Sequence, residues 1–142
     1  MRIAVVEDNA AICTMLSNML QLAGHVPAIY YEGWPFLDEL TRNYHIDDSK
    51  QPNLFDGVLL DVVLPGSISG TEIINYLYVT RPDLPLIVMS ALNSSDLANI
   101  QRQFPEVTML QKPFHLQELR VAIEGCRTIG VMSGGNVARM RA

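Results

Sequence analysis

The chain has 142 residues, of which 49% are hydrophobic and 18% charged, a composition typical of one globular domain and not of a disordered segment. Its apolar runs are too short to cross a bilayer, and Glu7 and Asp8 interrupt the N-terminal run, so we expect neither a membrane span nor a signal peptide. Cys13 and Cys126 are too few for a disulfide framework, which favours a reducing, cytoplasmic location.

The net charge of −5 is unevenly distributed along the chain. Residues 1–126 hold all 15 acidic residues and 7 of the basic ones, a net charge of −8. The charged residues of the segment 127–142 are all arginines. Because such an acidic body repels phosphate backbones, we expect no nucleic-acid binding by the globular part. The excess of carboxylates leaves room for a divalent-cation site.

The first part of the chain alternates short apolar runs with helical patterns. The run Ile3–Val6 predicts a strand, and apolar residues then recur at helical spacing over residues 12–23. Val26–Tyr30 predicts a second strand, and Pro35 can open a second helix. The polar segment His45–Asn53 predicts a loop.

The second part continues this alternation. Strands and helices are predicted in turn at Val58–Leu60, Thr71–Thr80, Leu86–Met89, Leu97–Phe104, Val107–Leu110 and Leu116–Cys126. The last segment has three glycines and no periodic pattern. We therefore expect a domain over residues 1–127, followed over residues 128–142 by a flexible tail or the start of a linker.

Five strands alternating with five helices predict an α/β protein whose parallel sheet is covered on both faces. Right-handed crossovers leave few topologies, and the leading one is a flavodoxin-like doubly wound fold with strand order 2-1-3-4-5. Folds of this kind bind ligands at the carboxyl ends of their strands. The residues that follow each strand are therefore the candidates for function.

Polar residues follow four of the five predicted strands: Glu7 and Asp8, Asp61, Ser90, and Lys112. Singly, each is ordinary as a helix cap, a turn residue or a surface charge. Together, three converging carboxylates need a cation, and oxygen ligands of this kind suit Mg²⁺. An aspartate beside a metal and a lysine can attack phosphorus and form an aspartyl phosphate, so phosphoryl transfer is a chemistry open to these residues.

At this point the sequence resembles the receiver domains of two-component response regulators, over about residues 2–127. The residues that carry the resemblance are Glu7-Asp8, Asp61, Pro65, Ser90-Ala91 and Lys112-Pro113-Phe114. Their order and spacing, taken as a set, are highly specific to this family.

The resemblance implies a role for each site residue. Asp61 would accept the phosphoryl group, and Asp8, Asp61 and the Val63 backbone carbonyl would bind Mg²⁺ directly. Glu7 would act on the metal through water. The resemblance further implies that Ser90 and Lys112 would each bind a phosphoryl oxygen. Ser90 and Met109 would move in the conformational switch, and the Lys112-Pro113 peptide bond would be cis.

Three features depart from the family pattern. The family usually has an aromatic residue three positions before the lysine, and here that position holds Met109. Gly70 lies nine residues after Asp61 where the family has eight, so this loop is one residue longer. The His45–Asn53 loop is also longer than usual.

The expected function is a phosphorylation-controlled signalling switch that is not a turnover enzyme. A histidine kinase or a histidine phosphotransfer protein would donate the phosphoryl group, and the face of the fourth helix, fifth strand and fifth helix would respond, with homodimerisation as one use of that face. The resemblance also implies that Val63 and Leu92 flank the path of an attacking water, and because both are apolar we expect a long-lived phosphorylated state.

The sequence leaves other functions open. One is a degenerate receiver that acts as a phosphorylation-independent interaction module. Another is an aspartate-nucleophile phosphohydrolase of the haloacid dehalogenase type, which is disfavoured because Val63 stands where that class needs a second aspartate. A dinucleotide-binding domain is weaker still, because no Gly-x-Gly-x-x-Gly motif follows the first strand.

Overall fold

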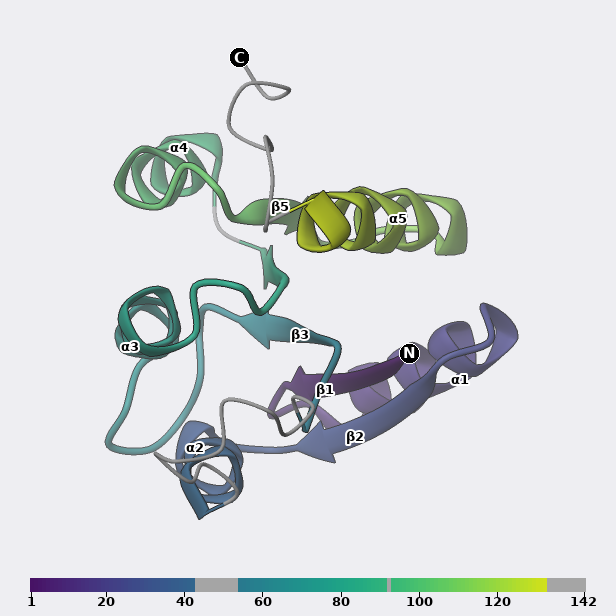
Figure 1. Cartoon of the computed structure of the whole chain (residues 1–142), viewed down its shortest axis with the longest axis horizontal. Coiled ribbons are helices and arrows are strands. Elements are labelled where there is room, and N and C mark those ends of the chain that lie inside the picture. Colours follow the sequence, from purple (N-terminus) through teal and green to yellow (C-terminus); the bar gives the residue numbers. More distant parts are fainter. Residues whose placement is uncertain (43–53, 92, 133–142) are drawn as a thin grey trace.

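The computed structural model describes residues 1–42, 54–91 and 93–132. Over these residues, five parallel strands form one sheet in the order β2-β1-β3-β4-β5 (Figure 1). The strands are β1 (Arg2–Val6), β2 (Val26–Tyr30), β3 (Gly57–Asp61), β4 (Leu86–Ser90) and β5 (Thr108–Gln111). This is the flavodoxin-like doubly wound α/β fold that the sequence predicts, and that prediction is confirmed.

Five helices cover the two faces of the sheet. They are α1 (Ala10–Leu22), α2 (Gly33–Arg42), α3 (Gly70–Thr80), α4 (Ser94–Gln103) and α5 (Leu116–Met132). Helices α1 and α5 pack on one face, and α2, α3 and α4 pack on the other (Figure 1). Every helix follows a strand, so each strand-to-helix loop opens at the same edge of the sheet.

The alternation of side chains along each strand creates two hydrophobic cores. In β3, Val58 and Leu60 point towards α2, α3 and α4, whereas Leu59 points towards α1 and α5. The strands β3 and β4 are buried along their whole length, as expected for central strands covered on both faces. The polar residues that end them, Asp61 and Ser90, are buried as well.

Side-chain caps fix where three helices begin. Asn9 accepts a hydrogen bond from the backbone N–H of Ile12 at 3.0 Å, and Asn93 accepts one from Asp96 at the start of α4. Ser69 and Glu72 form a reciprocal capping box at α3. Such caps typically contribute about 1 kcal/mol each and satisfy backbone donors that the helix leaves free.

The helix boundaries differ from the expected ones in two informative places. α2 begins at Gly33, two residues before Pro35, which therefore lies inside the first turn, where a missing N–H does no harm. α5 continues to Met132, past residue 127, where we expected the domain to end. The division into domain and tail stays a prediction, and the expected loop His45–Asn53 lies outside the described residues.

Candidate functional site

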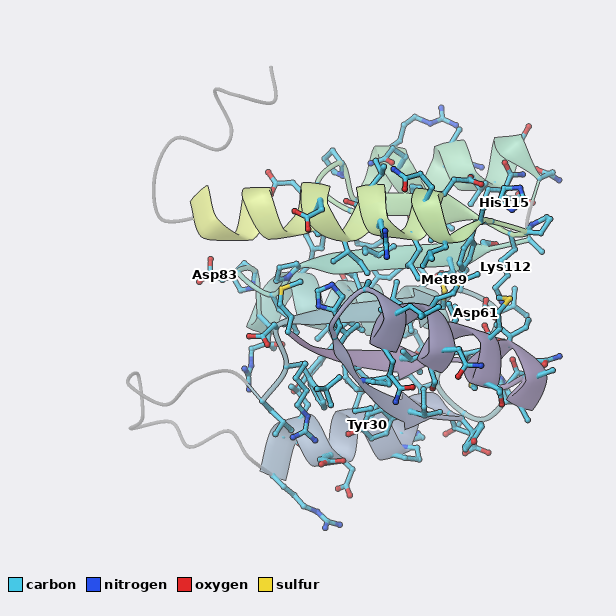
Figure 2. All side chains as sticks on the ribbon, turned by 90° about the vertical axis from the view of Figure 1, so that its right-hand side faces the viewer. Tyr30, Asp61, Asp83, Met89, Lys112 and His115 are labelled. Carbon is cyan, nitrogen blue, oxygen red and sulfur yellow. The ribbon has the colours of Figure 1, made fainter. Side chains whose placement is uncertain are left out.

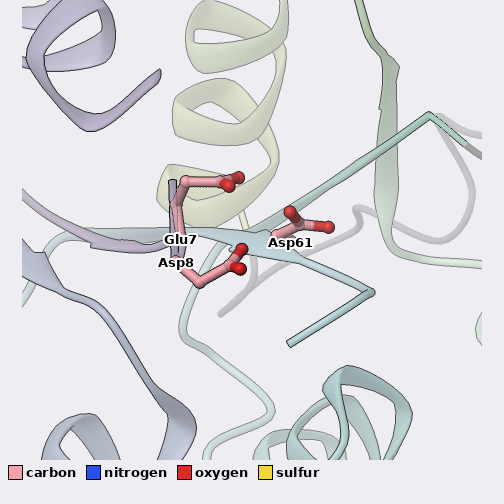
Figure 3. Close-up of side chains that lie close together, drawn as sticks. All are labelled: Glu7, Asp8 and Asp61. Atoms are coloured by element: carbon pink, nitrogen blue, oxygen red, sulfur yellow. The ribbon is translucent and has the colours of Figure 1, made fainter. Parts of the chain in front are cut away.

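Three carboxylates meet at the carboxyl edge of the sheet. One carboxylate oxygen from each of Glu7, Asp8 and Asp61 lies within 4.8 Å of the other two (Figure 3). Glu7 and Asp8 follow β1, and Asp61 ends the neighbouring strand β3, with Val6 paired to Leu60 in the register. Glu7 is 1% exposed and Asp61 6% exposed, whereas Asp8 is open to solvent.

Lys112 follows β5 and reaches the same carboxylates. Its Nζ lies 2.6 Å from Glu7 Oε2 and 2.8 Å from Asp61 Oδ2, and it donates a hydrogen bond to each. Figure 2 shows Lys112 and Asp61 at the same end of the molecule, opposite Asp83. The peptide bond between Lys112 and Pro113 is cis, as the resemblance implied.

Burial and pairing set the proton affinities of these groups. Burial, reinforced by the neighbouring Asp61, raises the pKa of Glu7 from its ordinary 4.5 to about 7, although the bond from Lys112 acts in the opposite direction. For Lys112, burial alone would lower the pKa, but the bonds to Asp61 and Glu7 outweigh it and raise the pKa above its usual value. The lysine is therefore a fixed positive charge at the carboxylates.

Ser90 and Met109 lie on the two strands beyond Asp61. Ser90 ends β4 and is fully buried, and its backbone carbonyl accepts a hydrogen bond from the Lys112 N–H at 2.8 Å. Met109 pairs with Val88 in the register and packs, partly buried, against the core under α2, α3 and α4. The structure thus gathers the carboxylates of Glu7, Asp8 and Asp61, and Lys112 contacts two of them. Ser90 is linked to this cluster through the backbone of Lys112.

The loop from β3 to α3 is held tightly at both ends. The Val63 N–H donates a hydrogen bond to Asp61 Oδ1 at 2.9 Å, and the Val63 side chain is 61% exposed. At the far end, a Cβ on Gly70 would lie 2.3 Å from the carbonyl oxygen of Val62, so only glycine fits there. The loop between Asp61 and Gly70 therefore closes on itself, one residue longer than the family pattern.

Some contacts at this edge were not predictable from the sequence. The Cys13 thiol donates to the backbone carbonyl of Glu7 at 3.2 Å, and burial raises the pKa of that thiol to about 11, so it stays protonated. The indole N–H of Trp34 donates to Ser67 Oγ at 2.6 Å. Neither pair shows a spacing or motif that could have revealed it.

The chemistry of the cluster fits a hard divalent cation. Three carboxylates offer only oxygen donors, and the two anionic side chains that are buried need more positive charge than one lysine supplies when both are ionised. The exposed Asp8 leaves one side of the cluster open to water and to an incoming group.

Within the described residues, no helix has the length and apolarity to traverse a bilayer.

Comparison with known proteins places this geometry in a family. The family model described as "Response regulator receiver domain" matches residues 3–124. Sporulation initiation phosphotransferase F of Bacillus subtilis is 27% identical over 123 residues, which are 87% of this chain and 90% of that protein. Response regulator MprA of Mycobacterium avium is 31% identical over 119 residues, 84% of this chain and 47% of its own length. The chain thus spans about half the length of the MprA relatives.

Solved structures agree on the fold. A CheY-like receiver domain protein from Methanospirillum hungatei superposes with a TM-score of 0.76 at 20% identity, covering 93% of this chain and 97% of that one. The response regulator DrrB of Thermotoga maritima gives a TM-score of 0.68 at 27% identity, over 87% of this chain and 50% of its own. The chain belongs to the response regulator receiver domain family.

Proposed function

We propose that this domain is a two-component signalling switch that accepts a phosphoryl group on Asp61 in a Mg²⁺-dependent reaction. The observation that carries the proposal is the position of Lys112 Nζ, 2.8 Å from Asp61 Oδ2, beside a cluster of three carboxylates. Asp61 thereby combines a nucleophilic oxygen, a fixed cation and a site for a divalent metal.

The reaction transfers a phosphoryl group from a phosphohistidine nitrogen to a carboxylate oxygen of Asp61. The nitrogen–phosphorus bond breaks, its electron pair stays on the histidine ring, and an oxygen–phosphorus bond forms. Asp8, Asp61 and the Val63 carbonyl would hold Mg²⁺, which neutralises charge on the phosphoryl oxygens when bound. Lys112 would stabilise the same charge, and the buried hydroxyl of Ser90 would donate a hydrogen bond to a further oxygen.

The phosphoryl donor in this proposal is a histidine kinase or a histidine phosphotransfer protein. Sporulation initiation phosphotransferase F, which the chain resembles over most of both lengths, supports a place in a phosphotransfer chain. The domain itself acts once per phosphoryl group and is a switch, not a turnover enzyme.

The responding face would be α4, β5 and α5, with Ser90 and Met109 as the moving residues. Gln101 on α4 donates its side-chain N–H groups to the carbonyls of Pro105 at 3.0 Å and Val107 at 3.1 Å, which ties the end of α4 to the start of β5. A shift of Ser90 towards a phosphoryl group would change the space beside Met109 and thereby the packing of this segment. A homodimer through the same face is one use of the change.

The test uses phosphoramidate, a small donor with a nitrogen–phosphorus bond, and follows the mass of the intact protein. We expect one added phosphoryl group in the presence of Mg²⁺ and none with a chelator. Asp61→Asn should abolish the addition, and Asp8→Ala, which removes a proposed Mg²⁺ ligand, should abolish its stimulation by Mg²⁺.

The matched control is Asp83→Asn, because Asp83 is an exposed carboxylate at the opposite end of the sheet (Figure 2). This variant should react as the wild type does. Full modification of Asp61→Asn would contradict the proposal. No modification of the wild type by any donor would favour the alternative of a phosphorylation-independent interaction module.

A further inference from the structure

The start of α2 lies directly against the loop that follows the proposed phosphoacceptor. A Cβ added to Gly33 would lie 2.6 Å from Ile68 Cγ2 and 2.7 Å from Ile73 Cδ1, which shows how closely these two side chains approach the α2 backbone. One residue further along α2, the Trp34 indole N–H donates to Ser67 Oγ at 2.6 Å. Consecutive residues on α2 therefore contact consecutive residues on the β3–α3 loop.

This contact joins α2 to the middle of the loop, where Leu64 and Ile68 also pack, partly buried, against the core. Val63 is held by its bond to Asp61, and Gly70 by its close approach to Val62. Gly66, between them, has a φ of +95°, a conformation that favours glycine and places the chain so that Ser67 faces Trp34. The loop carries one residue more than the family pattern, and extra length increases the conformational freedom that must be lost on ordering.

We infer that Trp34 and Ser67 form a latch that positions the β3–α3 loop, and with it the Val63 carbonyl, for Mg²⁺ binding. This inference rests on the proposed function, because Val63 is a proposed ligand. Trp34 and Ser67 are positioning residues, since neither belongs to the carboxylate cluster. Without the latch, the loop samples more conformations, and the cation must select the one in which the carbonyl faces it.

The proposal predicts a loss of Mg²⁺ affinity without loss of the fold. Trp34→Phe keeps an aromatic ring at this position and removes the indole N–H, and Ser67→Ala removes the acceptor. Because an intramolecular hydrogen bond of this kind has a modest net effect, each variant should bind Mg²⁺ about two- to fivefold more weakly. The double variant should lose no more than either single variant, since all three lack the same bond.

The measurement is a Mg²⁺ titration followed by the NMR amide shifts of Asp61 and Val63, with urea unfolding of each variant in parallel. Ser67→Thr retains a hydroxyl and should restore wild-type affinity. Ser17→Ala, which removes a serine hydroxyl within α1, is the matched control and should leave the affinity unchanged.

As a second readout, Trp34 is the only tryptophan in the sequence, so its fluorescence in the wild type should change as Mg²⁺ is added. Ser67→Ala should reduce that change.

Equal Mg²⁺ affinity in the wild type and the double variant would overturn the latch. A double variant whose fold-loss of affinity equals the product of the two single-variant losses would overturn it as well. The titration uses no phosphoryl donor, so the latch is decided separately from phosphorylation of Asp61. A wild type that binds Mg²⁺ but takes no phosphoryl group would refute the proposed function alone. A wild type that binds no Mg²⁺ would refute both.

Discussion

Ionisation of Glu7 should lower the free energy of unfolding of the metal-free protein at neutral and alkaline pH. Its carboxyl is 1% exposed, and burial raises its pKa from 4.5 to about 7. The folded state therefore binds the proton more tightly than the unfolded state, so the free energy of unfolding falls as pH rises between these two values. The difference corresponds to about 3 kcal/mol once Glu7 is fully ionised. Glutamine at this position has nearly the same shape and cannot ionise.

We therefore expect Glu7→Gln to be more stable than the wild type by about 3 kcal/mol at pH 8, with the gap closing as pH falls to 4.5. The assay is urea unfolding at a series of pH values in the presence of a metal chelator. Asp83→Asn removes one exposed carboxylate and should change the free energy of unfolding by less than about 0.5 kcal/mol throughout. Added Mg²⁺ should narrow the gap at pH 8, because a cation offsets the charge of Glu7.

A gap between Glu7→Gln and the wild type that does not vary with pH would refute this reasoning, because it would locate the effect in packing and not in ionisation. A variant less stable than the wild type at pH 8 would also refute it. In that case, the ion pair with Lys112, at 2.6 Å, would outweigh the cost of burying the charge.

The remaining predictions concern the lysine and the loop after β3. Lys112→Arg should reduce phosphorylation by phosphoramidate, because one compact ammonium contacts two carboxylates here and the guanidinium is larger and planar. Gly70→Ala should lower the free energy of unfolding by about 2 kcal/mol or more in urea, since its Cβ would lie 2.3 Å from the oxygen of Val62. Gly125→Ala, in an open helical position, should raise it by about 0.5–1 kcal/mol. Val63→Asn should shorten the lifetime of the phosphorylated protein, measured by loss of the added mass, because an amide can orient water where valine cannot.

The convergence of the site residues was predictable because it depends on topology. Once parallel strands alternate with helices, the residues after β1, β3, β4 and β5 must open at one edge, and the structure brings Glu7, Asp8, Asp61 and Lys112 together there. The strands were predictable because short apolar runs between polar turns are typical of buried strands in a parallel sheet. The roles of these residues in phosphoryl transfer stay predictions.

Contacts between elements far apart in the sequence were not predictable. The bond between Trp34 and Ser67 depends on how closely α2 approaches the β3–α3 loop, and that approach is set by the packing of Gly33 against Ile68 and Ile73. The pairing of Lys112 with Glu7 as well as Asp61 depends on the depth to which Glu7 is buried. The helix α5 extends to Met132 although its sequence contains glycines, so a glycine near a helix end does not always end the helix.

The chemical location of the phosphoryl group tests most directly whether Asp61 is the phosphoacceptor. The protein is phosphorylated with phosphoramidate and Mg²⁺ and then reduced with borohydride, which converts an aspartyl phosphate into homoserine. Peptide mass spectrometry locates the homoserine, with Asp83→Asn as a reacting control. We expect homoserine at position 61 alone and none without Mg²⁺. Homoserine at another aspartate, or a Mg²⁺-dependent phosphoryl group that yields no homoserine at position 61, would contradict it.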